Sequence, residues 1–356
     1  MSAGFAQDAV RSQKTNSMIL VTGGTGLLGS HLLYDLVSSG KPVRAIKRKS
    51  SNTGMVKKVF SYYSDHVDEL FGRIEWVEAD IMDFVSMDDA LEGIDIVYHA
   101  GAVVSFYPKD HKAMLTVNTE GTANLVNLCI ARKIKKFCYV SSVAVLGRAV
   151  NDGVSDETTY WQPSKKNSVY GQSKYGAERE IWRGIEEGLN AFIINPSVIL
   201  GPGFWGGGNS GLFSLVWKGL KYYTRGINGF VDVRDVAKTM VLLMESDISK
   251  ERFIVSSENC SYQQVFEYMA KYLGKPAPSI NVPNAMTGIA WRVEAVRSFF
   301  MRTLPEVTKE MAMTTTMVYT YSNEKIRKAL GFEFRPVEES IKDFSEFFLK
   351  DHLNIE

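Results

Sequence analysis

The 356-residue sequence contains few cysteines and no long hydrophobic run, and it carries almost no net charge. Its three cysteines, Cys129, Cys138 and Cys260, do not have the spacing of metal ligands, and we expect them to be small core or surface residues. This usage fits a reducing compartment such as the cytoplasm. We therefore predict no metal site.

The lack of net charge also limits the partners. A formal net charge of +1 gives no global reason to expect a nucleic acid or a membrane surface as a partner. No apolar stretch is long enough to span a bilayer, and residues 1–17 lack the apolar core of a signal peptide. We expect residues 1–17 to be a disordered leader and the partner to be a small-molecule substrate.

What the sequence does have is a glycine-rich turn between a strand pattern and a helix pattern. Residues 18–22 form a short, apolar, β-branched run, and residues 27–37 form an amphipathic run. Gly24, Gly26 and Gly29 have the spacing G-x-G-x-x-G. In this context the glycines let the backbone approach a pyrophosphate, which the N-terminus of the helix can bind. The alternative is an ordinary glycine-rich turn of an α/β protein.

Basic residues stand where an NAD site usually has an acid. The second predicted strand, 42–46, is followed by Lys47, Arg48 and Lys49, and no Asp or Glu occurs from 36 to 64. Because a guanidinium matches the geometry of a phosphate, Arg48 predicts binding to the 2′-phosphate of NADP. A solvated basic loop is the alternative.

Strand and helix patterns then alternate along the chain, which predicts right-handed βαβ crossovers and a doubly wound, parallel α/β sheet. The predicted strands are 74–77, 94–98 and 136–140, and the predicted helices are 88–91, 112–131 and 170–187. Further on, we predict a helix over 232–244, a short strand over 253–255 and a helix over 262–273.

Two segments carry candidate catalytic groups. Ser141 and Ser142 follow the fifth predicted strand, where ligands bind in open α/β sheets. Tyr170 and Lys174 are four residues apart and share one face of their helix. A nearby ammonium and an oxidised nicotinamide would lower the pKa of the phenol from about 10, which makes Tyr170 a candidate acid and base. A turn serine and a surface Tyr–Lys pair are the alternatives, and His99 is expected to be a packed core histidine.

Together these motifs resemble the extended short-chain dehydrogenase/reductases of the NAD-dependent epimerase/dehydratase superfamily. The resemblance implies that Ser142, Tyr170 and Lys174 are catalytic, and Ser142 is chosen because the family serine lies five residues before the glycine of its segment. The motifs are VTGGTGLLG at 21–29, Asp80–Ile81, VYHAGA at 97–102, VNTEGT at 117–122, YVSSVAVLG at 139–147, YGQSK at 170–174, NPSVILGPG at 195–203, VDVRDVA at 231–237 and KALGF at 328–332.

The resemblance also implies an NADP-binding Rossmann domain, 18–198 and 231–248, and a smaller, mostly helical substrate-binding domain, 199–230 and 249–356. Asp80 and Ile81 would border the adenine, and Pro196 and Ser197 would lie near the nicotinamide. The implied cofactor site consists of Gly23, Gly26, Leu27, Leu28, Gly29, Arg48, Asp80, Ile81, Ala100, Gly101, Ala102, Tyr170, Lys174, Pro196 and Ser197.

Within the family, the sequence is most similar to dihydroflavonol-4-reductase-like and 3β-hydroxysteroid dehydrogenase-like members. Val143 and Ala144 stand where sugar-nucleotide 4,6-dehydratases carry two acids, and Phe230 and Val231 offer no arginine of the kind that many epimerases have. We predict an NADP-dependent oxidoreductase that transfers a hydride between the nicotinamide and a ketone or secondary alcohol of a small, apolar or polycyclic substrate. The alternatives are a sugar-nucleotide epimerase that retains NAD and, more remotely, a non-catalytic NADP-sensing protein.

Apolar features outside the cofactor site predict an interface and a pocket. The helices 112–131 and 170–187 match the pair that associates in many family dimers, and Ile181, Trp182 and Ile185 give the second an apolar face. We predict a homodimer. The aromatic residues of 204–229 are expected to fold over the cleft, and a predicted helix over 285–300 is expected to be core or to line an apolar pocket.

Overall fold

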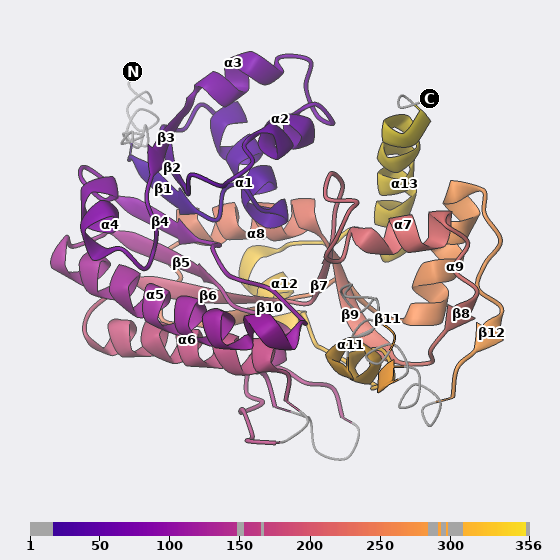
Figure 1. Cartoon of the computed structure of the whole chain (residues 1–356). Coiled ribbons are helices and arrows are strands. Elements are labelled where there is room, and N and C mark those ends of the chain that lie inside the picture. The colour runs from indigo at the N-terminus through magenta and orange to yellow at the C-terminus, as the bar shows by residue number, and fades with distance from the viewer. Residues whose placement is uncertain are drawn as a thin grey trace, which may run out of the picture.

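The computed structural model describes residues 17–147, 153–164, 167–283, 291–292, 297 and 309–353 (Figure 1). Most of the predicted leader, 1–17, and most of the predicted helix, 285–300, lie outside these ranges. Within them, no helix combines the length and the apolar character that crossing a membrane requires.

A seven-stranded parallel sheet forms the centre of the molecule, in the order β10-β6-β5-β4-β1-β2-β3. Strand β1 pairs with β2 on one side and with β4 on the other, so the strand order reverses there. This confirms the doubly wound parallel sheet, and the reversal marks the carboxyl ends of β1 and β4 as the position where open α/β sheets bind ligands. Strands β1 to β6 and β10 are Ile19–Thr22, Val43–Lys47, Ile74–Glu78, Ile96–His99, Lys136–Val140, Ala191–Pro196 and Arg252–Val255.

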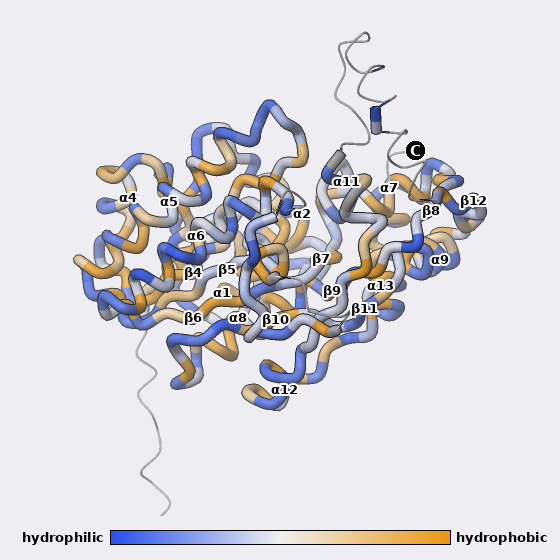
Figure 2. The backbone as a smooth tube through the Cα atoms, turned by 90° about the horizontal axis from the view of Figure 1, so that it is seen from below, coloured by the Kyte–Doolittle hydropathy of each residue, from blue (hydrophilic) through white to orange (hydrophobic). Residues whose placement is uncertain are grey.

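Helices cover both faces of the sheet because successive strand residues point to opposite sides. Val21 belongs to the same buried apolar cluster as Leu32 of α1 and Met240 of α8, whereas Leu20 belongs to the other cluster, with Ile181 of α6. Figure 1 shows α1 and α8 on one side and α5 and α6 on the other, and hydrophobic stretches run through these layers in Figure 2. The helices of this part are α1 (Leu27–Ser38), α2 (Gly54–Phe60), α3 (Val67–Gly72), α4 (Phe84–Ala90), α5 (His111–Ala131), α6 (Val169–Glu186) and α8 (Val233–Glu245), with short 3₁₀ turns η1 (Pro108–Asp110) and η2 (Val143–Val145).

The C-terminal region is mainly helical, as predicted, and it also holds two small sheets, β11-β9-β7 and β12-β8. Its helices are α7 (Gly211–Trp217), α9 (Tyr262–Leu273), α11 (Lys309–Thr314), α12 (Glu324–Leu330) and α13 (Val337–Leu353). Its strands are β7 (Val198–Leu200), β8 (Tyr222–Tyr223), β9 (Ile227–Asp232), β11 (Glu258–Ser261) and β12 (Ile280–Asn281).

Two features of this region differ from the sequence expectation. Strand β10 comes from 249–356, which the sequence assigned to substrate binding, but it pairs in parallel with β6 of the central sheet. The sequence of a short apolar strand does not show which sheet the strand will join. The sequence analysis therefore assigned β10 to the substrate-binding region because of its position along the chain. The aromatic residues Trp205, Phe213 and Trp217 pack on Phe348 of α13, with ring centroids 5.1, 6.3 and 5.8 Å away, rather than over a cleft.

Element boundaries follow local capping chemistry. Helix α9 ends as predicted, because Gly274 takes a left-handed conformation with a φ of 66°. Helix α4 begins at Phe84 instead of the predicted Asp88, because the carboxylate of Asp83 accepts a hydrogen bond from the Val85 N–H at 3.1 Å. The sequence pattern detected only the last turn of this helix.

Candidate active site

The glycine turn after β1 is packed so closely that side chains could not enter it. Gly23 has a φ of 72°, and a Cβ there would lie 2.6 Å from the Ala100 backbone. A Cβ on Gly29 would lie 2.1 Å from the carbonyl oxygen of Gly23. Glycine is therefore required at both positions, for the left-handed conformation at the first and for close helix packing at the second.

The turn leads into an open helix N-terminus. Gly26 is the N-cap of α1, and no side chain of the described residues caps it. Leu27 and Leu28 follow as the first residues of the helix. A glycine cradle beside uncapped helix N–H groups fits the pyrophosphate of a dinucleotide, so these residues match the cofactor that the sequence implies.

Basic side chains surround the end of β2. Arg48 is exposed, and its guanidinium forms no ion pair with the described residues, whereas Lys49 lies 3.6 Å from the Glu78 carboxylate. Glu78 ends β3 and is paired in register with Lys47. The sequence showed no acid after β2, but the fold brings one beside that position from β3, a neighbour that only the sheet order reveals.

Small residues follow β4, and two further predicted residues follow β3. The N–H of Gly101 donates to Thr22 Oγ1 at 3.2 Å, and a Cβ on Gly101 would lie 3.0 Å from the same oxygen. Ala100 and Ala102 flank Gly101, so a flat group can approach the backbone there. Asp80 accepts a hydrogen bond from the Met82 N–H at 2.9 Å. Next to Asp80, the side chain of Ile81 packs against Gly121 of α5.

His99 is a packed core histidine, as the sequence analysis favoured. Its side chain is fully buried, and Nδ1 lies 2.7 Å from Thr22 Oγ1 while Nε2 lies 2.9 Å from Thr122 Oγ1. Burial, together with the nearby charge of Lys174, lowers the pKa of His99 to about 3. The ring is therefore neutral at physiological pH and positions its neighbours.

The three candidate catalytic side chains come together where β5 and α6 meet. Ser142 follows β5, and its side chain lies near Tyr170 at the start of α6, where it favours the phenolate and so acts to lower the pKa of Tyr170. Ser142 Oγ also accepts from the Ala144 N–H at 3.1 Å. Lys174 lies one helical turn after Tyr170, and its Nζ donates to the carbonyl oxygen of Val140 at 2.6 Å.

Burial dominates the electrostatics of this group. It lowers the pKa of Lys174 to about 7, against the opposing effect of the Glu178 carboxylate. It also raises the pKa of Tyr170, and the hydrogen bond from Ser142 opposes this only in part. The sequence predicted a lowered pKa for Tyr170, and the structure corrects this for the protein alone, because desolvation of the phenolate outweighs the local partners.

The end of β6 supplies a further polar atom. Pro196 ends this strand, and Ser197 follows it with a backbone N–H that donates to the Val255 carbonyl at 3.1 Å. The hydroxyl of Ser197 is buried and has no hydrogen-bond partner among the residues that the structure describes. A buried hydroxyl without a partner is costly, so Ser197 fits a position that waits for a polar group of a ligand.

Sequence reasoning missed the polar side chains behind the three catalytic candidates. Glu178, Asn195 and Arg252 come from α6, β6 and β10, and all three interact in the structure. The available signal was the spacing of Glu178, which lies four residues after Lys174 on the same helix face. The other two could be found only once the order of the strands was known.

The outer surface of α6 differs from the sequence expectation. Ile181 is fully buried and Ile185 is 5% exposed, because both face the sheet beside β5 and β6. Trp182 is half-buried and donates to Glu178 at 3.3 Å. Most of the apolar face that the sequence analysis assigned to a dimer interface is therefore buried within the monomer.

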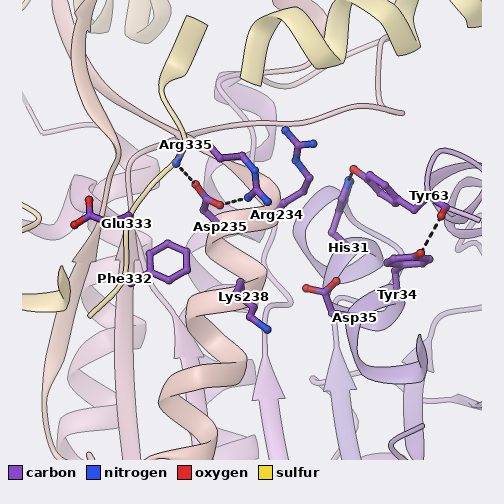
Figure 3. A pocket seen from close by; sticks show the side chains of 10 residues that line it. All are labelled: His31, Tyr34, Asp35, Tyr63, Arg234, Asp235, Lys238, Phe332, Glu333 and Arg335. Atoms are coloured by element: carbon purple, nitrogen blue, oxygen red, sulfur yellow. Dashed lines mark hydrogen bonds and ion pairs between the residues drawn. The ribbon is translucent and has the colours of Figure 1, made fainter. Parts of the chain in front are cut away.

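A cavity lies away from these residues, in the groove between α1 and α8. It has a volume of ≈ 470 Å³, and Figure 3 shows Asp35 of α1 and Lys238 of α8 lining it below the Arg335–Asp235 ion pair. His31 also lines it, with Nε2 3.0 Å from the hydroxyl of Tyr63. None of the predicted site residues lines this cavity.

Known proteins are similar to this chain in sequence and in fold. The sequence profile of the NAD dependent epimerase/dehydratase family matches residues 19–256. The chain is 29% identical over 291 residues to sterol demethylase protein B from Methylococcus capsulatus, which covers 80% of this chain and 84% of the relative. It is 30% identical over 276 residues to tetraketide alpha-pyrone reductase 2 from Arabidopsis thaliana, covering 73% and 84%. The structure of UDP-glucose 4-epimerase from Thermotoga maritima superposes with a TM-score of 0.73 at 21% identity, covering 94% of this chain and 99% of that one, a likeness that shows the fold alone.

Proposed function

The chain belongs to the NAD dependent epimerase/dehydratase family, and on that premise we propose that it is an NADP-dependent reductase or dehydrogenase of a ketone or secondary alcohol. The family includes extended short-chain oxidoreductases, so an NAD(P)-dependent reaction on a CH–OH group follows from membership. The observation that carries the proposal is that Ser142 at the end of β5 lies near Tyr170 on α6, and that Lys174, one helical turn after Tyr170, places Nζ 2.6 Å from the Val140 carbonyl oxygen of β5.

The chain's own groups supply the proton chemistry. NADPH, when bound, supplies the hydride for reduction. Tyr170 donates its phenolic proton to the carbonyl oxygen of the substrate, and the Ser142 hydroxyl holds that oxygen by a hydrogen bond. Burial keeps the phenol protonated until that step. Lys174 binds the ribose of the cofactor and stabilises the phenolate that remains, and the glycines of the turn hold the pyrophosphate.

NADP rather than NAD is proposed from the side chains at the end of β2. Arg48 is exposed and unpaired among the described residues, so it can form a fork with a 2′-phosphate. Glu78 is exposed at the neighbouring strand end, but Lys49 pairs with it. The adenine would lie between Asp80, Ile81 and the turn, and the nicotinamide near Pro196 and Ser197.

The substrate proposed is a small, apolar or polycyclic carbonyl compound. The names of two relatives, a sterol demethylase protein and an α-pyrone reductase, support a ring-containing substrate. The lack of two acids beside Ser142, where Val143 and Ala144 stand, argues against elimination from a sugar nucleotide. Residues 18–198 and 231–248 would bind the cofactor, and residues 199–230 and 249–356, apart from β10, would bind the substrate.

Location and assembly are proposed from the same features. The three cysteines are free and buried, which fits a cytoplasmic protein. A homodimer through α5 and α6 is proposed from the family resemblance, with the half-buried Trp182 on the outer part of α6.

A two-part assay tests the proposed function. Fluorescence titration should show tighter binding of NADPH than of NADH. A panel of cyclic ketones, aldehydes and UDP-sugars should show NADPH consumption with a ketone or aldehyde. Epimerisation of a UDP-sugar without net use of the cofactor would instead establish the epimerase, and cofactor binding with no turnover across a broad panel would favour a sensor.

A further inference from the structure

A buried carboxylate lies directly behind the catalytic candidates. The side chain of Glu178 is 3% exposed, and it accepts four hydrogen bonds. Oε2 accepts from Ser141 Oγ at 2.6 Å and from Asn195 Nδ2 at 3.0 Å. Oε1 accepts from Trp182 Nε1 at 3.3 Å and from Arg252 Nη1 at 3.2 Å. A carboxylate has about four acceptor sites, so Glu178 is fully satisfied in its ionised form.

Two of these partners fix the backbone at the end of β5. Besides binding Glu178, Asn195 Nδ2 donates to the carbonyl oxygen of Ser142 at 3.1 Å. The Ser141 hydroxyl binds Glu178, and its N–H donates to the Ile194 carbonyl at 2.8 Å. The direction of the Ser142 hydroxyl, and hence its position relative to Tyr170, depends on this backbone.

The fourth partner ties the same carboxylate to the segment beside β10. Arg252 Nη2 donates to the carbonyl oxygens of Glu157 and Thr159 at 2.7 and 3.2 Å, and Arg252 Nε donates to Glu157 at 2.9 Å. The N–H of Ile254 donates to the Glu157 carboxylate at 2.8 Å. Glu178 therefore anchors the guanidinium that holds this segment on the sheet edge.

Glu178 also faces Lys174 from one turn along α6. The other groups around the ammonium are neutral: the Tyr139 ring on β5, 4.4 Å from Nζ, the buried His99 on β4, and Tyr170 on α6 itself. Among the described groups, Glu178 is the one whose charge raises the pKa of Lys174, against the larger effect of burial. Its loss would make Lys174 easier to deprotonate.

We propose that Glu178 is a positioning residue of the active site, which fixes the Ser142 backbone through Ser141 and Asn195 and presents the negative charge that faces Lys174. It touches neither substrate nor cofactor in this role. The proposal rests on the proposed function for its turnover measurement but not for its measurement on the free protein.

The first test measures the titration of Lys174 in the absence of any substrate. Glu178→Gln keeps the shape of the side chain but removes its charge, and its amide nitrogen cannot accept the two hydrogen bonds that one oxygen accepted. The Lys174 signal of protein labelled with ¹³Cε-lysine, assigned by its absence in Lys174→Arg, should titrate about one pH unit lower in the variant. Glu180→Gln, on the same helix and paired with Arg183, should leave the midpoint unchanged. An unchanged midpoint in Glu178→Gln would overturn the role toward Lys174.

The second test measures the effect of the Ser142 position on turnover, with a ketone that the assay above has identified as a substrate. Glu178→Gln should lower kcat by about 10–100-fold with little change in KM, because a small displacement of Ser142 costs turnover rather than binding. Ser141→Ala should lower kcat less, and the double variant should be no slower than Glu178→Gln alone. Independent, multiplicative losses would contradict action through Ser141.

The experiments distinguish a variant that does not fold from a failure of the proposed function. NADPH titration at pH 6, where Lys174 is mostly charged in the wild type, verifies that each variant is folded. If Glu178→Gln does not fold, Ser141→Ala carries the kinetic test, with a wild-type kcat overturning the proposal. If the wild type reduces no carbonyl compound, the proposed function fails, while the Lys174 titration still decides the role of Glu178.

Discussion

The hydroxyl of Tyr170 is the group that we expect to donate and accept the proton during turnover. Tyr170→Phe removes the proton donor but leaves the glycine turn and Arg48, so NADPH binding should stay nearly unchanged. Turnover should fall by about 10²–10⁴-fold, the range for losing a general acid or base. Steady-state kinetics and a fluorescence titration of NADPH measure the two quantities on the same samples.

A tyrosine on the same helix provides the control for this change. Tyr175 stacks on Trp161 with ring centroids 4.7 Å apart, away from Ser142, so Tyr175→Phe should retain turnover. For alcohol oxidation, the wild-type rate should rise with pH through the pKa of Tyr170, and Tyr170→Phe should lose this dependence. Wild-type turnover in Tyr170→Phe would show that this tyrosine is not the acid and base.

Arg48 decides the choice of cofactor in our proposal. Arg48→Ala should weaken NADPH binding by about 1.5–3 kcal/mol, the usual scale for a hydrogen bond to a charged group. NADH has no 2′-phosphate, so its affinity should change little. Parallel titrations of both cofactors measure the difference. Arg73→Ala, an exposed arginine paired with Glu69, is the matched control, and an equal loss for both cofactors would exclude 2′-phosphate recognition.

At the scale of elements, the groove between α1 and α8 makes the stability depend on pH. Burial raises the pKa of Asp35 to about 6 from 3.8, although Lys238 and Arg335 oppose the shift. The folded state therefore binds this proton more tightly than the unfolded state, and stability decreases as the pH rises from about 4 to 6. Asp35→Asn should raise the free energy of unfolding at pH 7 by about 1–3 kcal/mol.

The comparison must be made as a difference between variant and wild type. Burial lowers the pKa of His31, in the same groove, to about 4 from 6.5, so His31 reduces stability as the pH falls through this range. Denaturant unfolding at pH 4 and pH 7 separates the two effects, since the advantage of Asp35→Asn should vanish near pH 4. An equal advantage at both pH values would contradict the assignment to Asp35.

Sequence patterns predicted the strands and helices of the central parallel sheet well, because each of these elements has its own local sequence pattern. The glycine turn predicted the join of β1 and α1, and the Tyr–Lys spacing on α6 placed two side chains on one face. The membership of β10 and the partners of Glu178 could not be predicted, because they depend on which segments become neighbours in space. Asn195 follows Glu178 on the next strand, β6, and Arg252 lies much further along the chain on β10, so no periodicity links them to Glu178.

For the whole molecule, the prediction is a homodimer through α5 and α6. Ile181 and Ile185 are buried in the monomer, so the apolar residues left for a partner include Leu115, 38% exposed, and the half-buried Trp182. Light scattering at micromolar concentration should give twice the chain mass. Leu115→Glu should shift the protein toward the monomer, whereas Val85→Glu on α4 should not. A monomeric wild type would refute this assembly.

The position of β10 late in the sequence has a consequence for the nascent chain during translation. Three strands and two helices, β7 to β9, α7 and α8, separate β10 from its neighbour β6. Until residues 252–255 leave the ribosome, β6 is an open edge, and all six of its residues belong to the buried interior. Open apolar edges recruit strands from other chains. We expect a nascent chain that stalls before residue 252 to depend on a chaperone, and a fragment ending at residue 248 to aggregate.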